Sequence, residues 1–258
     1  FNPDISSSGD TYYFRGDDLS YERASAFNTW LNTSSTSWST TTNWSLGSVP
    51  TSTSNVGLYD YGNSDPLIPT EQTINNLVVG SGVSTQIDND KSLTVDGNLF
   101  VSGALILEST SAGSGSLIVH GTATGSVTIE RYIGGETSAT KGWHFLSSPL
   151  ANQNISTQFV DVTATPIASG VDFYRWSETE GLWINIKNEA GNYNKGSGET
   201  YFSNEETPTF NIGKGYLVAY STNQDKTFSG SLQTTGYDIS GLTNTNGKAY
   251  AGWHLLGN

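Results

Sequence analysis

The chain has 258 residues, of which 34% are hydrophobic and 14% charged, with a net charge of −13 and neither cysteine nor methionine. An acidic surface repels phosphate backbones, so we expect no nucleic acid partner. The absence of cysteine excludes disulfides, and because no run of eighteen apolar residues occurs we expect no membrane insertion. Abundant Ser, Thr, Asn and Gly favour strands and turns over helices.

Residues 1–37 are predicted to form an N-terminal extension. Its stretch FRGDDLSYERASAF has the only helical character in the chain. The tripeptide Arg15-Gly16-Asp17 matches an integrin-type signal, but we interpret it as a chance match on a solvated surface.

Residues 38–135 are predicted to form a β-solenoid-like region. Short apolar pairs at period two, such as Leu77/Val79 and Leu93/Val95, alternate with Gly, Asn and Asp turn signals. Leu77, Leu99 and Leu117 are 22 and 18 residues apart, and Ile87, Ile106 and Val127 are 19 and 21 apart. A period near twenty favours the rungs of a short parallel β-helix, with an antiparallel sandwich as the alternative.

Residues 140–258 are predicted to form an aromatic-rich antiparallel β-sandwich, which we expect to be incomplete at its C-terminus. Residues 171–186 read as a hairpin around the turn SETEG. Further strands are expected within 210–221, within 226–242 and at 253–256. A linker is expected at 134–138. The fold class is therefore all-β.

A short element occurs twice, as KGWHFLSSP from Lys141 and as AGWHLLGN from Ala251. Both copies hold Gly-Trp-His before apolar residues. This context predicts that Trp143 and Trp253 are buried core residues on strands. We expect His144 and His254 to cap or bridge strands beside them, because no metal-ligand spacing surrounds either histidine.

Two further sets of residues are candidate sites. Asp88, Asp90 and Asp96 lie in neighbouring turns and could together bind Ca²⁺, although aspartate is also common in tight turns without a metal. Trp176 and Trp183 flank the hairpin turn and are candidates for stacking on sugar rings. For any single tryptophan, burial is the more common outcome.

The chain resembles the large extracellular proteins that Bacteroidota export by the type IX secretion route. The resemblance rests on TNWSLGSVPTSTSNV, TINNLVVGSG, LTVDGNLFVSGALIL, VTIERYIGG, GWHFLSSPL, GKGYLVAYS and AGWHLLGN, and it covers roughly residues 38–258. It implies an extracellular or cell-surface location and an adhesin-like multidomain protein.

The sequence contains no nucleophile elbow, phosphate-binding loop or dinucleotide fingerprint. We therefore expect a structural or adhesive module rather than an enzyme. Its expected partners are other copies or segments of the same protein, in assemblies that extend to fibres. The alternative is a carbohydrate-binding accessory region that contacts polysaccharide beside an enzyme domain; a polysaccharide lyase is a third and weaker reading, because it would rest on fold analogy alone.

Overall fold

The computed structural model describes residues 27–31, 35–62, 65–137, 142–233 and 236–257, and it confirms the all-β fold class. The predicted helical stretch and the Arg15–Asp17 tripeptide lie outside these residues, apart from Phe27 at the end of that stretch. Within the described residues the one helix is the short 3-10 helix η1 (Thr41–Asn43), and none is long and apolar enough to cross a membrane. The chain divides into two compact units, Phe1–Leu107 with Gly115–Gly125, and Glu108–Ser114 with Ser126–Asn258.

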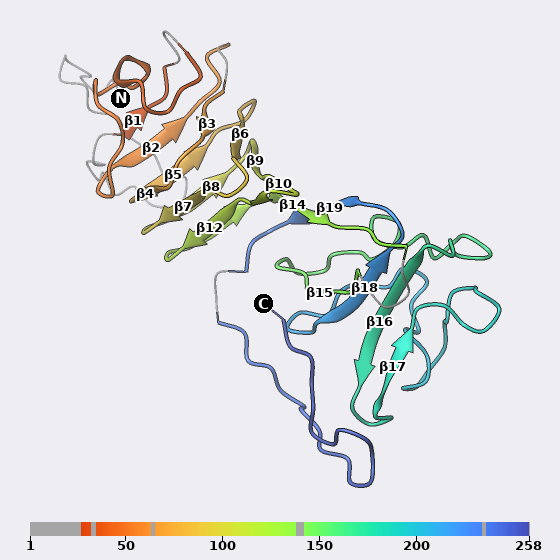
Figure 1. The fold of residues 1–258 in the computed structure, drawn as a ribbon. Coiled ribbons are helices and arrows are strands. Elements are labelled where there is room, and N and C mark those ends of the chain that lie inside the picture. The colour runs from red at the N-terminus through yellow and green to blue at the C-terminus, as the bar shows by residue number, and fades with distance from the viewer. Residues whose placement is uncertain (1–26, 32–34, 63–64, 138–141, 234–235, 258) are drawn as a thin grey trace, which may run out of the picture. The chain divides into compact units, whose positions relative to one another are not determined.

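The first unit is part of a parallel β-solenoid of about three turns (Figure 1). Parallel pairing confirms the solenoid and excludes the antiparallel alternative for this unit. The solenoid has three sides, and each side is a ladder of parallel strands. The first ladder consists of β1 (Phe27–Thr29), β2 (Asn55–Leu58), β5 (Asn76–Val79), β8 (Leu99–Val101) and β13 (Ala123–Gly125). The second consists of β4 (Gln72–Ile74), β7 (Ser92–Val95) and β12 (Ser116–Val119), and the third of β3 (Leu67–Ile68), β6 (Ser84–Ile87) and β9 (Ala104–Leu107).

The stacking register differs from the predicted one in two places. Leu77 does lie beside Leu99, but Leu117 pairs with Leu93 rather than with Leu99. The reason is that Leu117 lies on the side of β4 and β7, whereas Leu99 lies on the side of β5 and β8 and pairs with Ala123 in the next coil. Ile87 pairs with Leu107 and not with Ile106. A shift of one residue places a side chain on the opposite face of its strand, and Leu105 and Leu107 are the buried ones here.

A ladder of asparagine side chains runs along one corner of the solenoid. The Asn76 amide donates to Asn55 Oδ1 at 2.6 Å, Asn76 Oδ1 accepts the Asn98 N–H at 2.6 Å, and Asn98 Oδ1 accepts the Thr122 N–H at 2.9 Å. These partners are 21, 22 and 24 residues apart. Each coil therefore satisfies main-chain or amide groups of the next where the strands turn.

Three tryptophans of the polar N-terminal region pack together beside the first coil. Trp44 meets Trp30 and Trp38 edge to face at 5.1 and 4.7 Å, and its indole N–H donates to Trp38 O. All three are buried. These three therefore follow the more common outcome for a tryptophan, which is burial.

The second unit is antiparallel (Figure 1). The predicted hairpin is confirmed as β16 (Val171–Ser177) and β17 (Leu182–Asn185), at one edge of the sheet β15–β18–β16–β17. The other strands are β10 (Ser109–Thr110) with β11 (Gly113–Ser114), β14 (Val127–Ile133) with β19 (Gln224–Gly230), and, in the sheet, β15 (His144–Leu146) and β18 (Tyr216–Tyr220).

The end of this unit is less regular than predicted. The strand expected at 253–256 is reduced to a single bridge between Leu256 and Lys214, and the described residues between 231 and 242 form no strand after β19. The reason is that this stretch is rich in Gly, Thr and Asn and buries few apolar side chains.

An aromatic cluster forms the core of the second unit. Phe173 of β16 is fully buried and lies 5.8 Å from Phe210, ring centroid to ring centroid. Phe228 of β19 lies 5.6 Å from Phe210 and 4.8 Å from Phe159. The four-stranded sheet and the β14–β19 ribbon therefore share one core. Because this core occupies the inner face of β16, the side chains that alternate with it point away.

Candidate functional site

The outer face of the four-stranded sheet carries a row of aromatic side chains, which we call the aromatic row. On β16 the buried residues are Phe173 and Ser177, so Tyr174 and Trp176 project from the opposite face. Trp183 of β17 is the cross-strand partner of Trp176. The row consists of Trp143, Tyr174, Trp176, Trp183, Tyr250 and Trp253.

The two Gly-Trp-His copies supply the flanking tryptophans of this row. Trp143 packs edge-on against Tyr174 at 5.8 Å, and Trp253 packs edge-on against Trp176 at 4.8 Å. The glycine before each tryptophan has a positive φ, +75° at Gly142 and +80° at Gly252, which other residues rarely adopt. The repeat therefore builds the same local turn twice.

The histidines of the two copies also behave alike. His144 Nε2 lies 3.0 Å from Gly134 O and His254 Nε2 lies 2.9 Å from Thr243 O, carbonyls that stand 10 and 11 residues earlier in the chain. Each imidazole bridges its turn to the preceding segment. The expectation that these histidines bridge strands is met only in part, because His144 lies in β15 whereas Gly134, Thr243 and His254 lie outside the strands.

The prediction that Trp143 and Trp253 are buried core residues on strands is wrong. Their side chains are 38% and 41% exposed, and neither lies in a strand. In β15 the residue that points inward is Leu146, so Phe145 and the preceding Trp143 belong to the outer side. Trp253 lies in the irregular C-terminal segment, which has no alternation to bury it.

Trp176 is the centre of the row. Trp183, Tyr250 and Trp253 surround it at centroid distances of 5.4, 6.1 and 4.8 Å, all edge to face. Its indole N–H donates to Trp253 O at 2.8 Å. The sugar-binding candidates Trp176 and Trp183 are therefore brought together, and the structure adds Trp143, Tyr174, Tyr250 and Trp253 to them.

Polar groups lie at the other end of the row, beyond Tyr174. The Asn185 amide donates to the Tyr174 hydroxyl at 3.0 Å, and Lys187 Nζ lies 3.1 Å from Asp172 Oδ1. Asp172, Asn185 and Lys187 line an open hollow of about 490 Å³. Burial, and then the charge of Asp172, raise the pKa of Tyr174, so its hydroxyl is neutral near pH 7.

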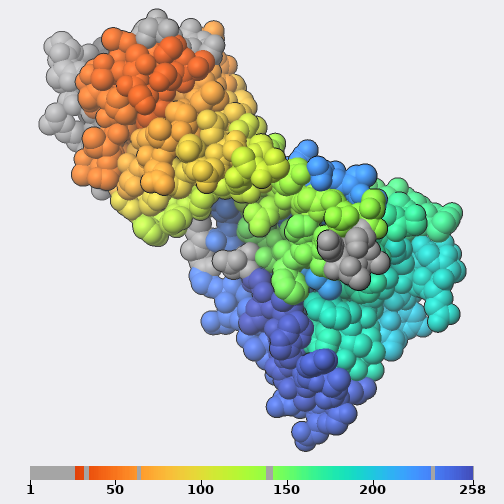
Figure 2. All heavy atoms as spheres, viewed as in Figure 1, coloured from red at the N-terminus to blue at the C-terminus, as the bar shows by residue number. Residues whose placement is uncertain are grey.

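The segment 236–257 lies on the surface of the second unit, drawn in dark blue in Figure 2, and most of its residues are exposed. Glu178, in the hairpin turn, anchors it. The residue is 4% exposed, and its carboxylate accepts hydrogen bonds from the Thr243 hydroxyl (2.5 Å), the Thr245 N–H (2.7 Å) and hydroxyl (2.9 Å), and the Gly252 N–H (2.9 Å). The Thr243 hydroxyl most of all, then the N–H groups of Gly252 and Thr245, lower the pKa of Glu178 to about 2.

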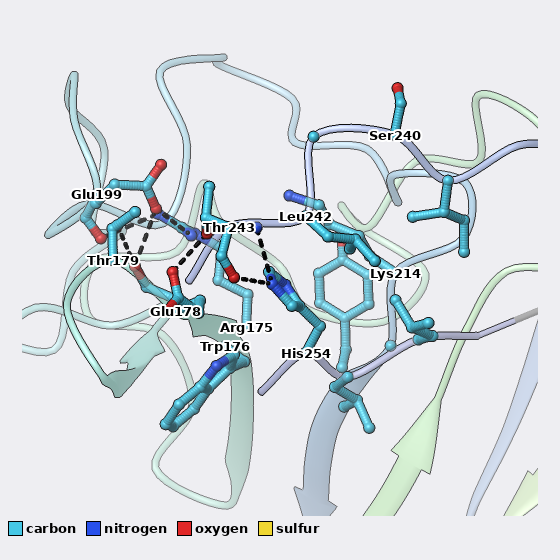
Figure 3. A pocket seen from close by; sticks show the side chains of 17 residues that line it. Arg175, Trp176, Glu178, Thr179, Glu199, Lys214, Ser240, Leu242, Thr243 and His254 are labelled. Carbon is cyan, nitrogen blue, oxygen red and sulfur yellow. Dashed lines mark hydrogen bonds and ion pairs between the residues drawn. The ribbon is translucent and has the colours of Figure 1, made fainter. Parts of the chain in front are cut away.

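A cavity of about 210 Å³ lies beside this anchor, with Glu178, Thr243 and His254 gathered at its wall (Figure 3). Arg175 is committed to internal bonds there, to Glu199 Oε2 at 3.1 Å and to Phe202 O at 3.0 Å. Burial alone would raise the pKa of Glu199, but the Arg175 hydrogen bond and charge outweigh it, so the pKa lies below its usual value. This cavity is therefore a framework for the C-terminal segment, and its carboxylates are poorly suited to general-acid work.

The aspartates of the predicted Ca²⁺ site lie in the first unit. Asp88 and Asp90 belong to the turn after β6, where Asp90 has a φ of +62°, and Asp96 follows β7. Asp96 Oδ1 lies 3.0 Å from His120 Nδ1. In the part of the chain that the structure describes, no three His, Asp, Glu or Cys residues are grouped as a metal site. The Ca²⁺ site stays a prediction.

Fold and site together define an all-β protein with a parallel solenoid and an aromatic outer face on an antiparallel sheet. The chain matches the family described as Domain of unknown function (DUF8693) over residues 29–258, so it belongs to this family. The comparisons with curated proteins and with solved structures gave no match.

Proposed function

We propose that the chain is an extracellular adhesive module of a larger bacterial surface or secreted protein. In this proposal the solenoid serves as a stiff structural element and the antiparallel sheet carries the attachment surface. The observation that carries it is the aromatic row. Trp143 and Trp253 are more than a third exposed and Tyr250 is 74% exposed, although the opposite face of the same sheet packs against the buried aromatic core.

Exposed aromatic rings that lie side by side on one face are typical of binding surfaces. Tryptophan and tyrosine offer large apolar area together with a polar handle, and they contribute most to many interfaces. A binding rather than a catalytic role is supported by the cavity beside Glu178, where Arg175 is bonded to Glu199 and the Glu178 carboxylate is bonded to Thr243.

The extracellular location and the bacterial source rest on the resemblance to type IX-secreted proteins. The acidic, cysteine-free composition agrees with that setting. Partners of an adhesive module are other copies of the chain or a polysaccharide. The second candidate function, a carbohydrate-binding accessory region, is favoured by the pairing of Trp176 with Trp183 beside polar Asn185.

Two measurements on the whole chain test the proposal. Retention on insoluble polysaccharide particles measures attachment, and analytical ultracentrifugation at several protein concentrations, with and without Ca²⁺, measures self-association. The double variant W176A/W183A should reduce either activity roughly tenfold or more. Phe100→Ala is the matched control, because Phe100 is 49% exposed on the solenoid and lies outside the row. A chain that neither attaches nor associates refutes the proposal.

A further inference from the structure

We propose that the aromatic row binds a neutral polysaccharide along β16, and that the loop 243–252, held by Glu178, is the part that positions Tyr250 for this ligand. The inference rests on the proposed adhesive function and names its ligand class and its positioning residue.

The spacing of the row suits a chain of repeating units. Tyr174 and Trp176 are two residues apart on one strand, which places them about 7 Å apart along it. Trp143 continues the row past Tyr174, and Trp183, Trp253 and Tyr250 continue it past Trp176. No two of these neighbouring rings stack face to face, since their interplanar angles are 61–87°. Each edge-to-face contact covers part of one face of one ring, so the row keeps partly open ring faces rather than closed parallel stacks.

The chemistry of the surface matches that of a sugar. A pyranose ring has an apolar C–H face and a rim of hydroxyls, so it needs an aromatic platform with hydrogen-bonding groups at the edge. The row supplies the platform, and Asp172, Asn185 and Lys187 lie around the open hollow at its end. Such a site is mostly apolar with a few placed polar groups, as binding sites for small organic units usually are.

The charges around the row select a neutral ligand over an anionic one. Lys187, Lys248 and Arg175 are each paired with a carboxylate, that of Asp172, Glu180 and Glu199 respectively. The whole chain carries a net charge of −13. The negative net charge would therefore repel an anionic polysaccharide, and these three cationic side chains would not be free to attract it.

The loop 243–252 is held in a conformation that needs support. Tyr250 has a φ of +57°, in the left-handed region that a tyrosine adopts only at a cost. Its ring is nevertheless 74% exposed and stands 6.1 Å from that of Trp176. Glu178 ties both ends of the loop to the hairpin turn, through Thr243 and Thr245 at one end and Gly252 at the other. A buried anchor thus keeps an exposed aromatic ring beside the row.

The experiment uses the whole chain in affinity electrophoresis with soluble polysaccharides: a β-glucan, a mannan and a xylan as neutral probes, and polygalacturonate as the anionic probe. Tyr250→Ala tests the ring, and Glu178→Gln replaces one carboxylate oxygen, which accepts two of the four hydrogen bonds, by an amide nitrogen and removes the negative charge. Glu180→Gln is the matched control, because Glu180 lies in the same turn and reaches the same loop only through a surface ion pair with Lys248, and surface ion pairs contribute little.

We expect binding to at least one neutral probe, a roughly tenfold loss in Y250A and in E178Q, and a change below about twofold in E180Q. In the double variant E178Q/Y250A the two losses should not add, because Glu178 acts through Tyr250. Thermal unfolding of each variant confirms that the second unit is folded. Additive losses, as a general loss of structure would give, overturn the positioning role.

The outcomes separate this inference from the proposed function. Tighter binding to polygalacturonate than to every neutral probe overturns the ligand class. Neutral binding that W176A/W183A abolishes but Y250A and E178Q leave intact overturns the role of the loop and keeps the adhesive function. Self-association without polysaccharide binding overturns the ligand and keeps adhesion between copies. If the chain shows neither polysaccharide binding nor self-association, both proposals are overturned.

Discussion

Two neighbouring residues of β16 provide a sharp test of which face of the sheet is core. Phe173 is fully buried, and its ring lies 5.8 Å from Phe202, 5.8 Å from Phe210 and 5.5 Å from Tyr216. Phe173→Ala removes a ring from a packed cluster, so we expect it to lower the free energy of unfolding by about 3–5 kcal/mol. The loss of three aromatic contacts places the expected value toward the upper end of this range.

Tyr174→Ala is the matched comparison on the outer face. It removes one edge contact with Trp143 and one hydrogen bond from Asn185. We expect a cost of about 1–2 kcal/mol, since each interaction contributes about 1 kcal/mol or less on a half-buried surface.

Equilibrium urea unfolding measures both variants. Far-ultraviolet circular dichroism and tryptophan fluorescence are followed together, and the two units are fitted as separate transitions. The midpoint of the second unit should shift much more for Phe173→Ala than for Tyr174→Ala, at an unchanged denaturant slope. Equal shifts would refute the reasoning, because they would mean that the outer face is as buried as the inner one and that the row is not a surface.

Three further outcomes are expected. Gly121→Ala places a Cβ 2.3 Å from the main-chain oxygen of Gly97, so thermal unfolding should show the first unit destabilised by about 1–3 kcal/mol, whereas Gly236→Ala, with open space at the Cβ, should be neutral. Asn76→Ala breaks two bonds of the asparagine ladder and should lower the free energy of unfolding by about 1–2 kcal/mol in urea titration; a neutral result would show that the ladder is incidental. Because the pKa of Glu178 falls from 4.5 to about 2 on folding, its contribution is complete above pH 4.5 and is lost as the pH falls toward 2. The difference in melting temperature between wild type and Glu178→Gln should therefore shrink over that interval, and a constant difference would contradict the assignment.

The solenoid could be predicted because its signal is local. Alternating apolar residues between turn signals, repeated near every twenty residues, indicate rungs whatever their partners are. The exact stacking could not be predicted, because spacing does not show on which side of a coil a strand lies, so that Leu117 stacks on Leu93 and not on Leu99, and because the β10–β11 hairpin lengthens the last coil. Nothing in the residues of that hairpin marks it as an insertion rather than a rung.

The candidate site could be predicted only in part, because local sequence does not show which face of a strand a side chain occupies. The sequence marks Trp176 and Trp183 by their place beside a turn, but it predicts Trp143 and Trp253 as core residues, because a tryptophan next to apolar residues usually is buried. The face of a strand depends on its register, and a shift of one residue reverses it. In the segment HFL, Leu146 rather than Phe145 points inward, and only the pairing of β15 with β18 decides this. Tyr250 gave no signal in sequence, since its place depends on the distant Glu178.

The coil construction of the first unit also limits how the family can vary in length. Each coil pairs with its neighbours along all three sides and through the asparagine corner, with partners 21, 22 and 24 residues apart. A partial insertion within a strand would break every ladder at once, whereas an added rung would repeat the same contacts. Length differences among relatives should therefore lie in the turns, as the β10–β11 hairpin does, or come in steps of one coil, each of which extends the stack by about 4.8 Å. Evolution can change the reach of such a protein in these steps without redesigning the sheet that bears the aromatic row.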